Sequence, residues 1–167
     1  KQEGDSLSGI LPLAVFSIFA MIYPKGVIPP TPNKITVWAY LFFITENTGH
    51  ALFYLGCWYA AVNYIKKNNS GSHYPFIVWG FVLFSISQVV GAVWALLGWG
   101  TVFRWGSRHL QSAAIWCYFA ACLHLRFLPL WDKRKKLLLT AAGIIIVLVS
   151  TFGSYLHEMG FPRIGGQ

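Results

Sequence analysis

The segment GAVWALLGWGTVFRWGSRHLQSAAIWCYFAACLHLR, residues 91–126, joins two apolar runs through a short glycine-rich loop. Tryptophans Trp99 and Trp105 flank the loop, and His124 lies inside the second apolar run. A hydrocarbon core of about 30 Å requires roughly 20 predominantly apolar residues in a helix. The segment therefore predicts two membrane-spanning helices that meet at one membrane surface.

The whole chain has the composition of a membrane protein. Of its 167 residues, 56% are hydrophobic and 11% are charged, and the mean hydropathy is +0.53. Soluble domains carry about 25% charged residues. We expect an all-α, polytopic transmembrane helix bundle in a single domain over residues 1–167. Its five predicted helices cover residues 7–23, 36–65, 75–97, 110–130 and 137–156; the first is the weakest prediction, because it is short and contains Pro12.

The net charge of +8 is concentrated in two loops. Lys66 and Lys67 form one basic group and residues 133–136 form the other, which is the pattern of cytoplasmic loops. This clustering excludes nucleic acid as a partner and predicts the lipid bilayer instead. We expect a prokaryotic or organellar inner membrane, with the tryptophan loop, the proline-rich residues 23–34 and the C-terminus outside. The two lysines of residues 23–34 keep the inverse topology as an alternative.

The three cysteines, Cys57, Cys117 and Cys122, all lie in apolar runs. None belongs to a C-x-x-C-H motif, so this chain does not attach haem covalently by that motif. We expect them to be small buried apolar residues. The chain begins without Met, which is expected of a processed chain or of a part of a longer one.

Aromatic and cationic side chains alternate in the loop. An interfacial aromatic belt is one interpretation. A site for haem is the other, because indoles stack on a flat macrocycle and arginines pair with its propionates. The candidate residues are Trp99, Arg104, Trp105, Arg108 and His109.

The same stretch resembles the tryptophan-rich signature of the cytochrome c assembly family, the CcsA, ResC and CcmC type of haem-handling membrane proteins. In that family a G-A-x-W-A segment leads to W-G-x-x-W-x-W-D and then to L-H-x-R. The tail FGSYLHEMG, residues 152–160, is similar to the family's closing segment. The acidic residue of the signature is Gly106 here. The matching residues are Gly91, Ala92, Trp94, Ala95, Trp99, Gly100, Trp105, Trp116, Leu123, His124 and Arg126.

Two histidines inside predicted helices are candidate ligands of haem iron, since an ionisable residue within a membrane helix suggests a function. His124 matches the family's intramembrane haem histidine, whereas His50 is inferred from its position alone. Glu46 lies one turn before His50 and is expected to accept its ring N–H, while Gly49 would admit a flat ring. Counted inward from Thr36 and from His109, the two histidines lie about 21 and 22 Å deep. Counted from the other helix ends, they are about two turns apart.

Two further histidines lie at the outer ends of predicted helices. The resemblance implies that His157 is the external haem histidine, and His109 is a candidate partner for it at the same face. We expect one or two non-covalent, b-type haems in total. Ser87 and Gln88, on the third predicted helix, are weak candidates for binding a quinone.

Two functions follow, and the sequence does not decide whether the protein is an enzyme. The first is handling haem at the outer membrane face for cytochrome c biogenesis, as the resemblance implies. The second is a b-type cytochrome subunit that transfers electrons between a quinol and an outer multihaem cytochrome c within a larger respiratory complex. A structural anchor without a cofactor is the third interpretation. Cytochrome c and other membrane-complex subunits are the expected partners.

Overall fold

The structure is a computed structural model, and it describes residues 14–15, 18, 36–67, 71–103 and 107–160; side chains are described up to residue 150, apart from those of residues 99, 107 and 108. The chain divides into two compact units, Lys1–Ile35 and Thr36–Gln167. Nearly all of the first predicted helix, residues 7–23, lies outside the described residues. The prediction of one domain over the whole chain therefore stays a prediction.

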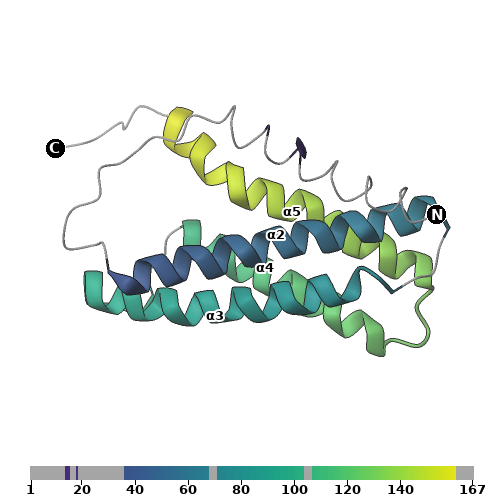
Figure 1. The fold of residues 1–167 in the computed structure, drawn as a ribbon, viewed down its shortest axis with the longest axis horizontal. Coiled ribbons are helices and arrows are strands. Elements are labelled where there is room, and N and C mark those ends of the chain that lie inside the picture. The colour runs from purple at the N-terminus through teal and green to yellow at the C-terminus, as the bar shows by residue number, and fades with distance from the viewer. Residues whose placement is uncertain (1–13, 16–17, 19–35, 68–70, 104–106, 161–167) are drawn as a thin grey trace. The chain divides into compact units, whose positions relative to one another are not determined.

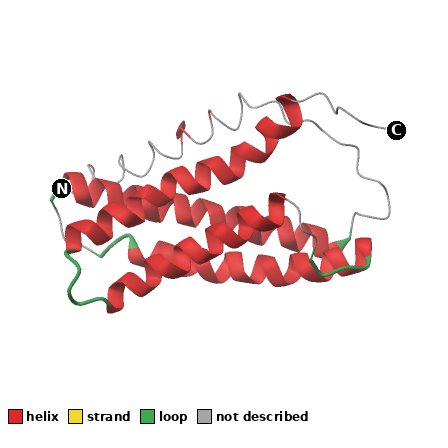
Figure 2. Ribbon diagram, turned by 180° about the vertical axis from the view of Figure 1, so that it is seen from behind, coloured by secondary structure: helices red, strands yellow, loops and turns green. Residues whose placement is uncertain are grey.

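The second unit is all-helical in its described part, as predicted (Figure 2). Its helices are α2 (Val37–Ile65), α3 (Tyr74–Trp99), α4 (Ser107–His124) and α5 (Lys133–Gly160), with a short 3₁₀ helix, η2 (Leu125–Phe127), after α4. The α2 and α4 helices run in one direction, and α3 and α5 run in the other (Figure 1). One end of the bundle joins α2 to α3 and α4 to α5; we call it the basic end. The opposite end joins α3 to α4, and we call it the loop end.

The α3 helix has the composition of a membrane span. Its residues Tyr74–Gly98 have a mean hydropathy of 2.1, and 22% of the apolar window is buried within the protein. Among the described helices it is the one that is long and apolar enough to cross a membrane by itself. Pro75 lies in its first turn, where a missing N–H costs nothing, and Gly100 ends it in the left-handed conformation with φ of 73°.

Close contact between α2 and α3 depends on two glycines. A Cβ on Gly49 would lie 3.1 Å from both the backbone nitrogen and the Cβ of Phe84. A Cβ on Gly80 would lie 3.2 Å from the carbonyl oxygen of Gly49. Small residues at a crossing allow two helix backbones to approach, which is how membrane helices pack without a hydrophobic driving force. The sequence-based role of Gly49, admitting a flat ligand, is therefore wrong: α3 fills that space.

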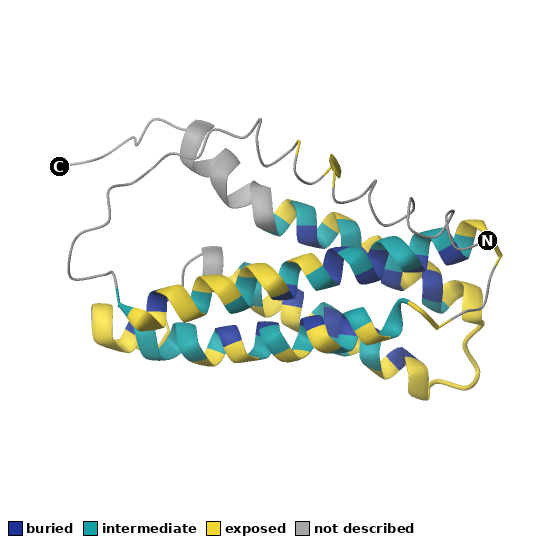
Figure 3. Ribbon diagram, in the orientation of Figure 1, coloured by how far each residue is buried: buried dark blue, intermediate teal, exposed yellow. Residues whose placement is uncertain are grey.

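The core lies toward the basic half of α2, where its buried residues concentrate (Figure 3). Phe53 of α2 stacks on Phe119 of α4, with ring centroids 3.7 Å apart and planes within 3°. Cys57 and Cys122 are buried as predicted, whereas Cys117 is exposed and corrects that expectation. A Cβ on Gly143 of α5 would lie 2.8 Å from the sulfur of Cys57, so this glycine lets α5 close the core.

The fourth helix is shorter than its apolar pattern predicts. It was expected over residues 110–130, but α4 begins at Ser107 and ends at His124, followed by the 3₁₀ turn. The cause is Pro129, because a proline disfavours the helical conformation in the residue before it. Leu128 is extended, with φ of −94° and ψ of 93°. His124 therefore lies at a helix end and not well inside a membrane helix as expected.

Candidate functional site

His124 is the last residue of α4, and its ring is exposed. Its Nδ1 atom lies 2.7 Å from the carbonyl oxygen of Ala120, one turn earlier. Because a carbonyl can only accept a hydrogen bond, this contact requires the proton to be on Nδ1. The Nε2 atom then carries a lone pair, which is the tautomer that a metal-ligating imidazole needs. The helix backbone performs the orienting role that a carboxylate performs at many metal sites.

His50 lies near the middle of α2, and its ring centroid is 5.2 Å from that of Phe84 on α3. Its Nε2 atom is buried and has no hydrogen-bond partner. Nε2 therefore donates no bond to Glu46, and a bond from the other ring nitrogen to that carboxylate stays a prediction. A buried polar atom without a partner costs free energy, about 1–3 kcal/mol in proteins. A ligand bound at this nitrogen of His50 would offset that cost.

The two histidines are not at the same level of the bundle. His50 precedes Phe53 by three residues, and His124 follows Phe119 by five. Since the two phenylalanines stack and α2 and α4 run in the same direction, the imidazoles are eight residues apart, about 12 Å along the bundle. Two imidazoles that ligate one iron must face each other across it. The structure does not bring His50 and His124 together in that way.

The loop end holds the other predicted site residues. The half-buried ring of His109, in the first turn of α4, meets the ring of Phe103 edge to face, with centroids 5.1 Å apart. His157 belongs to α5, but its side chain lies outside the described part of the chain. The same holds for the side chains of Trp99 and Arg108 and for all of Arg104 and Trp105. The predicted pairing of His109 with His157 stays a prediction.

Two tryptophans of the signature stabilise helix packing. The indole Nε1 of Trp116 donates to the hydroxyl of Ser85, 3.0 Å away on α3, beside Phe81. The ring of Trp94 contacts those of Phe42 and Phe43 on α2, with centroids 5.8 Å away in each case. These contacts tie α3 to both of its neighbours. They are a structural role that the sequence did not distinguish from ligand binding.

The candidate quinone residues bond within their own helix. The hydroxyl of Ser87 donates to the carbonyl oxygen of Phe84 at 2.7 Å, and the amide of Gln88 donates to that hydroxyl at 3.3 Å. Ser87 is fully buried. Its hydrogen-bonding capacity is thus used locally, and nothing in this geometry supports a quinone site.

The described part of the chain is a helical bundle with one membrane-type helix and an exposed histidine whose proton is fixed on Nδ1. Comparison with known proteins gives the family. The sequence model described as "Cytochrome C assembly protein" matches residues 58–161, and the chain belongs to this family. The match includes α3, α4, α5 and the tryptophan-rich loop between α3 and α4.

Similar proteins include longer ones that are named as cytochrome c biogenesis proteins. "Cytochrome c biogenesis protein CcsA" from Prochlorococcus marinus (strain AS9601) is 39% identical over 92 residues, which are 55% of this chain and 30% of the relative. The protein of the same name from Gloeothece citriformis (strain PCC 7424) is 36% identical over 92 residues, 28% of its length. The chain thus matches less than a third of each. No solved structure matches the chain significantly.

Proposed function

We propose that this chain binds haem as cargo, first at His124 at the basic-end terminus of α4, and then presents it at the loop end of the bundle for cytochrome c biogenesis. The observation that carries the proposal is the hydrogen bond from Nδ1 of His124 to the carbonyl of Ala120. It leaves Nε2 as an exposed donor atom for iron, in a chain that belongs to the cytochrome c assembly family. Haem supplies an iron whose axial positions accept imidazole nitrogen.

Exposure of His124 suits a cargo better than a resident cofactor. A haem that must be handed on has to leave, and a ligand at a helix end can release it without unpacking the bundle. His124 would contribute one nitrogen ligand to the haem iron in this proposal. At the loop end, His109, His157 and the loop residues Trp99, Arg104, Trp105 and Arg108 would receive the haem before its attachment.

The electron-transfer alternative needs two imidazoles of this chain on one iron within the membrane. The buried, unpartnered Nε2 of His50 is the observation that favours it. The offset of about 12 Å between His50 and His124 counts against it, because α2 would have to slide by two turns. That movement would separate Phe53 from Phe119 and bring Gly49 out of its contact with α3.

The test is haem retention by the detergent-purified protein, measured as pyridine haemochrome together with a reduced-minus-oxidised spectrum. His124→Gly is expected to lose haem, and added imidazole is expected to restore it by filling the vacated position. Cys117→Ala is the matched control, because Cys117 is an exposed possible iron ligand on the same helix. Its haem content should equal that of the wild type.

Two outcomes decide against the proposal. Full haem retention in His124→Gly would mean that His124 does not bind haem. If the wild-type protein holds no haem at all, the protein is better interpreted as a structural anchor without a cofactor. A His50→Ala variant separates the two functions. If it loses haem together with His124→Gly, and the wild-type haem is reversibly redox-active, the electron-transfer alternative is correct.

A further inference from the structure

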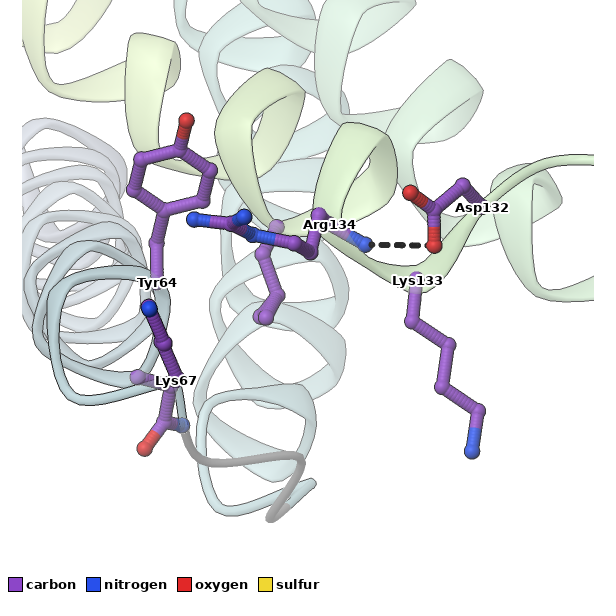
Figure 4. A pocket seen from close by; sticks show the side chains of 7 residues that line it. Tyr64, Lys67, Asp132, Lys133 and Arg134 are labelled. Carbon is purple, nitrogen blue, oxygen red and sulfur yellow. Dashed lines mark hydrogen bonds between the residues drawn. The ribbon is translucent and has the colours of Figure 1, made fainter.

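A polar cavity lies at the basic end, between the end of α2 and the start of α5 (Figure 4). Its volume is about 330 Å³. Three cationic side chains line it, together with one carboxylate, a buried amide, a tyrosine and a leucine. The lining residues are Asn63, Tyr64, Lys67, Asp132, Lys133, Arg134 and Leu137.

The three cations of this cavity outnumber its single carboxylate, Asp132, so an excess of positive charge remains. The guanidinium of Arg134 lies over the ring of Tyr64, 5.1 Å from its centroid. Asp132 accepts a hydrogen bond from the backbone N–H of Arg134 at 3.4 Å, and Lys133 points away from Tyr64 (Figure 4). Within the described part of the chain, no ion pair joins Asp132 to any of the three cations. Like charges gathered in one cavity attract an anion.

The backbone of Lys67 provides a second, independent observation. Lys67 directly follows the C-cap of α2 with φ of 52°, and it is the only described residue other than glycine with a positive φ. Where a helix ends in a residue of this left-handed conformation, that residue is usually glycine, because a side chain is strained there. Lys67 therefore has a strained backbone conformation, and its side chain lines the cavity. Strain of this kind concentrates at functional positions.

We infer that this cavity binds the phosphate of an anionic phospholipid from the leaflet at the basic end. Phosphate suits the cavity because Arg134 offers planar donors, while lysines offer point charges. A lipid suits it because the apolar side chain of Ile65, next to the lining residue Tyr64, is 77% exposed, so that an acyl chain can lie against it. Basic sites between membrane helices recognise anionic headgroups in this way. The inference rests on placement of the bundle in a membrane and not on haem binding.

The experiment compares lipid retention in nanodiscs of phosphatidylcholine mixed with phosphatidylglycerol. Phosphatidylglycerol that stays bound to the purified protein is measured by native mass spectrometry. Lys67→Gln and Arg134→Gln are each expected to lower its retention about fivefold, because each removes a basic group that lines the cavity and faces the bound phosphate. Lys135→Gln is the matched control, since Lys135 is adjacent on α5 but lines a separate, apolar cavity beside Tyr118 and Trp131. It should change retention by less than about twofold.

Three results would overturn the inference. They are equal retention of phosphatidylglycerol and phosphatidylcholine by the wild type, an equal loss in all three variants, and displacement of the bound lipid by inorganic phosphate alone. The last would identify free phosphate as the ligand. Circular dichroism verifies that each variant stays helical. Haem retention is measured in parallel and should not change, so failure of the lipid site and failure of the proposed function remain distinguishable.

Discussion

Replacement of Gly49 by alanine tests the contact between α2 and α3 most directly. The new methyl group would lie 3.1 Å from the backbone nitrogen of Phe84 and 3.3 Å from the carbonyl oxygen of Gly80. Backbone atoms cannot rotate away as the end of a side chain can, so the two helices must separate. Overpacking of this kind costs about 1–3 kcal/mol.

Gly98→Ala is the matched control for the intrinsic effect of alanine. Gly98 lies in α3, and a Cβ there would have no atom within 4 Å. Alanine favours a helix over glycine by about 1 kcal/mol, and this gain applies to both positions. The two variants therefore differ by the overpacking cost alone. For a chain of this size, about 2–4 °C per kcal/mol converts that cost to roughly 2–12 °C in Tm.

The assay is thermal unfolding in detergent, followed by circular dichroism at one protein concentration. Gly98→Ala should unfold above the wild type, and Gly49→Ala should unfold below Gly98→Ala by the stated interval. Gly80→Ala adds a second test, because its Cβ would lie 3.2 Å from the carbonyl oxygen of Gly49. Once one alanine has separated the helices, the second should cost less, so the double variant should be less than additive. Equal Tm values for Gly49→Ala and Gly98→Ala would refute the close crossing.

Three further predictions concern the core, a cap and one hydrogen bond. Phe119→Ala removes a fully buried ring stacked on Phe53, and it should lower the free energy of unfolding by about 3–5 kcal/mol, measured by denaturant titration. Lys67→Gly relieves a strained backbone, so the Tm should rise by the equivalent of about 1 kcal/mol while retention of phosphatidylglycerol falls. The hydrogen bond between Trp116 and Ser85 should contribute about 0.6–1.7 kcal/mol, measured by a double-mutant cycle of Trp116→Phe and Ser85→Ala.

Each of these predictions has a clear contrary result. A small loss in Phe119→Ala would mean that the rings are not stacked as described. A Tm of Lys67→Gly below that of the wild type would mean that no strain is released there. A coupling energy of zero between Trp116 and Ser85 would mean that their hydrogen bond does not stabilise the packing of α3 on α4.

The sequence predicted the helices well where the apolar pattern and its boundaries agree. The second helix was expected over residues 36–65 and is Val37–Ile65, and the third was expected over residues 75–97 and is Tyr74–Trp99. Basic or glycine-containing segments border these runs, and helix formation depends mainly on such local information. The cytochrome c assembly family was also readable, because its signature is a contiguous stretch with fixed spacing.

Tertiary structure alone decided the relation between the histidines. The sequence allowed two results for His50 and His124: equal depth in the bundle, or a separation of two helical turns. The stacking of Phe53 on Phe119 shows that the two histidines are two turns apart. From the sequence, Gly49 was predicted to make room for a flat ligand. In the structure, α3 packs against that side of Gly49. The basic residues at 67 and 133–134 are far apart in the chain, and helix packing makes them one cavity. Periodicity reports which face of a helix is apolar, but register and neighbours depend on contacts between distant residues, which no local pattern contains.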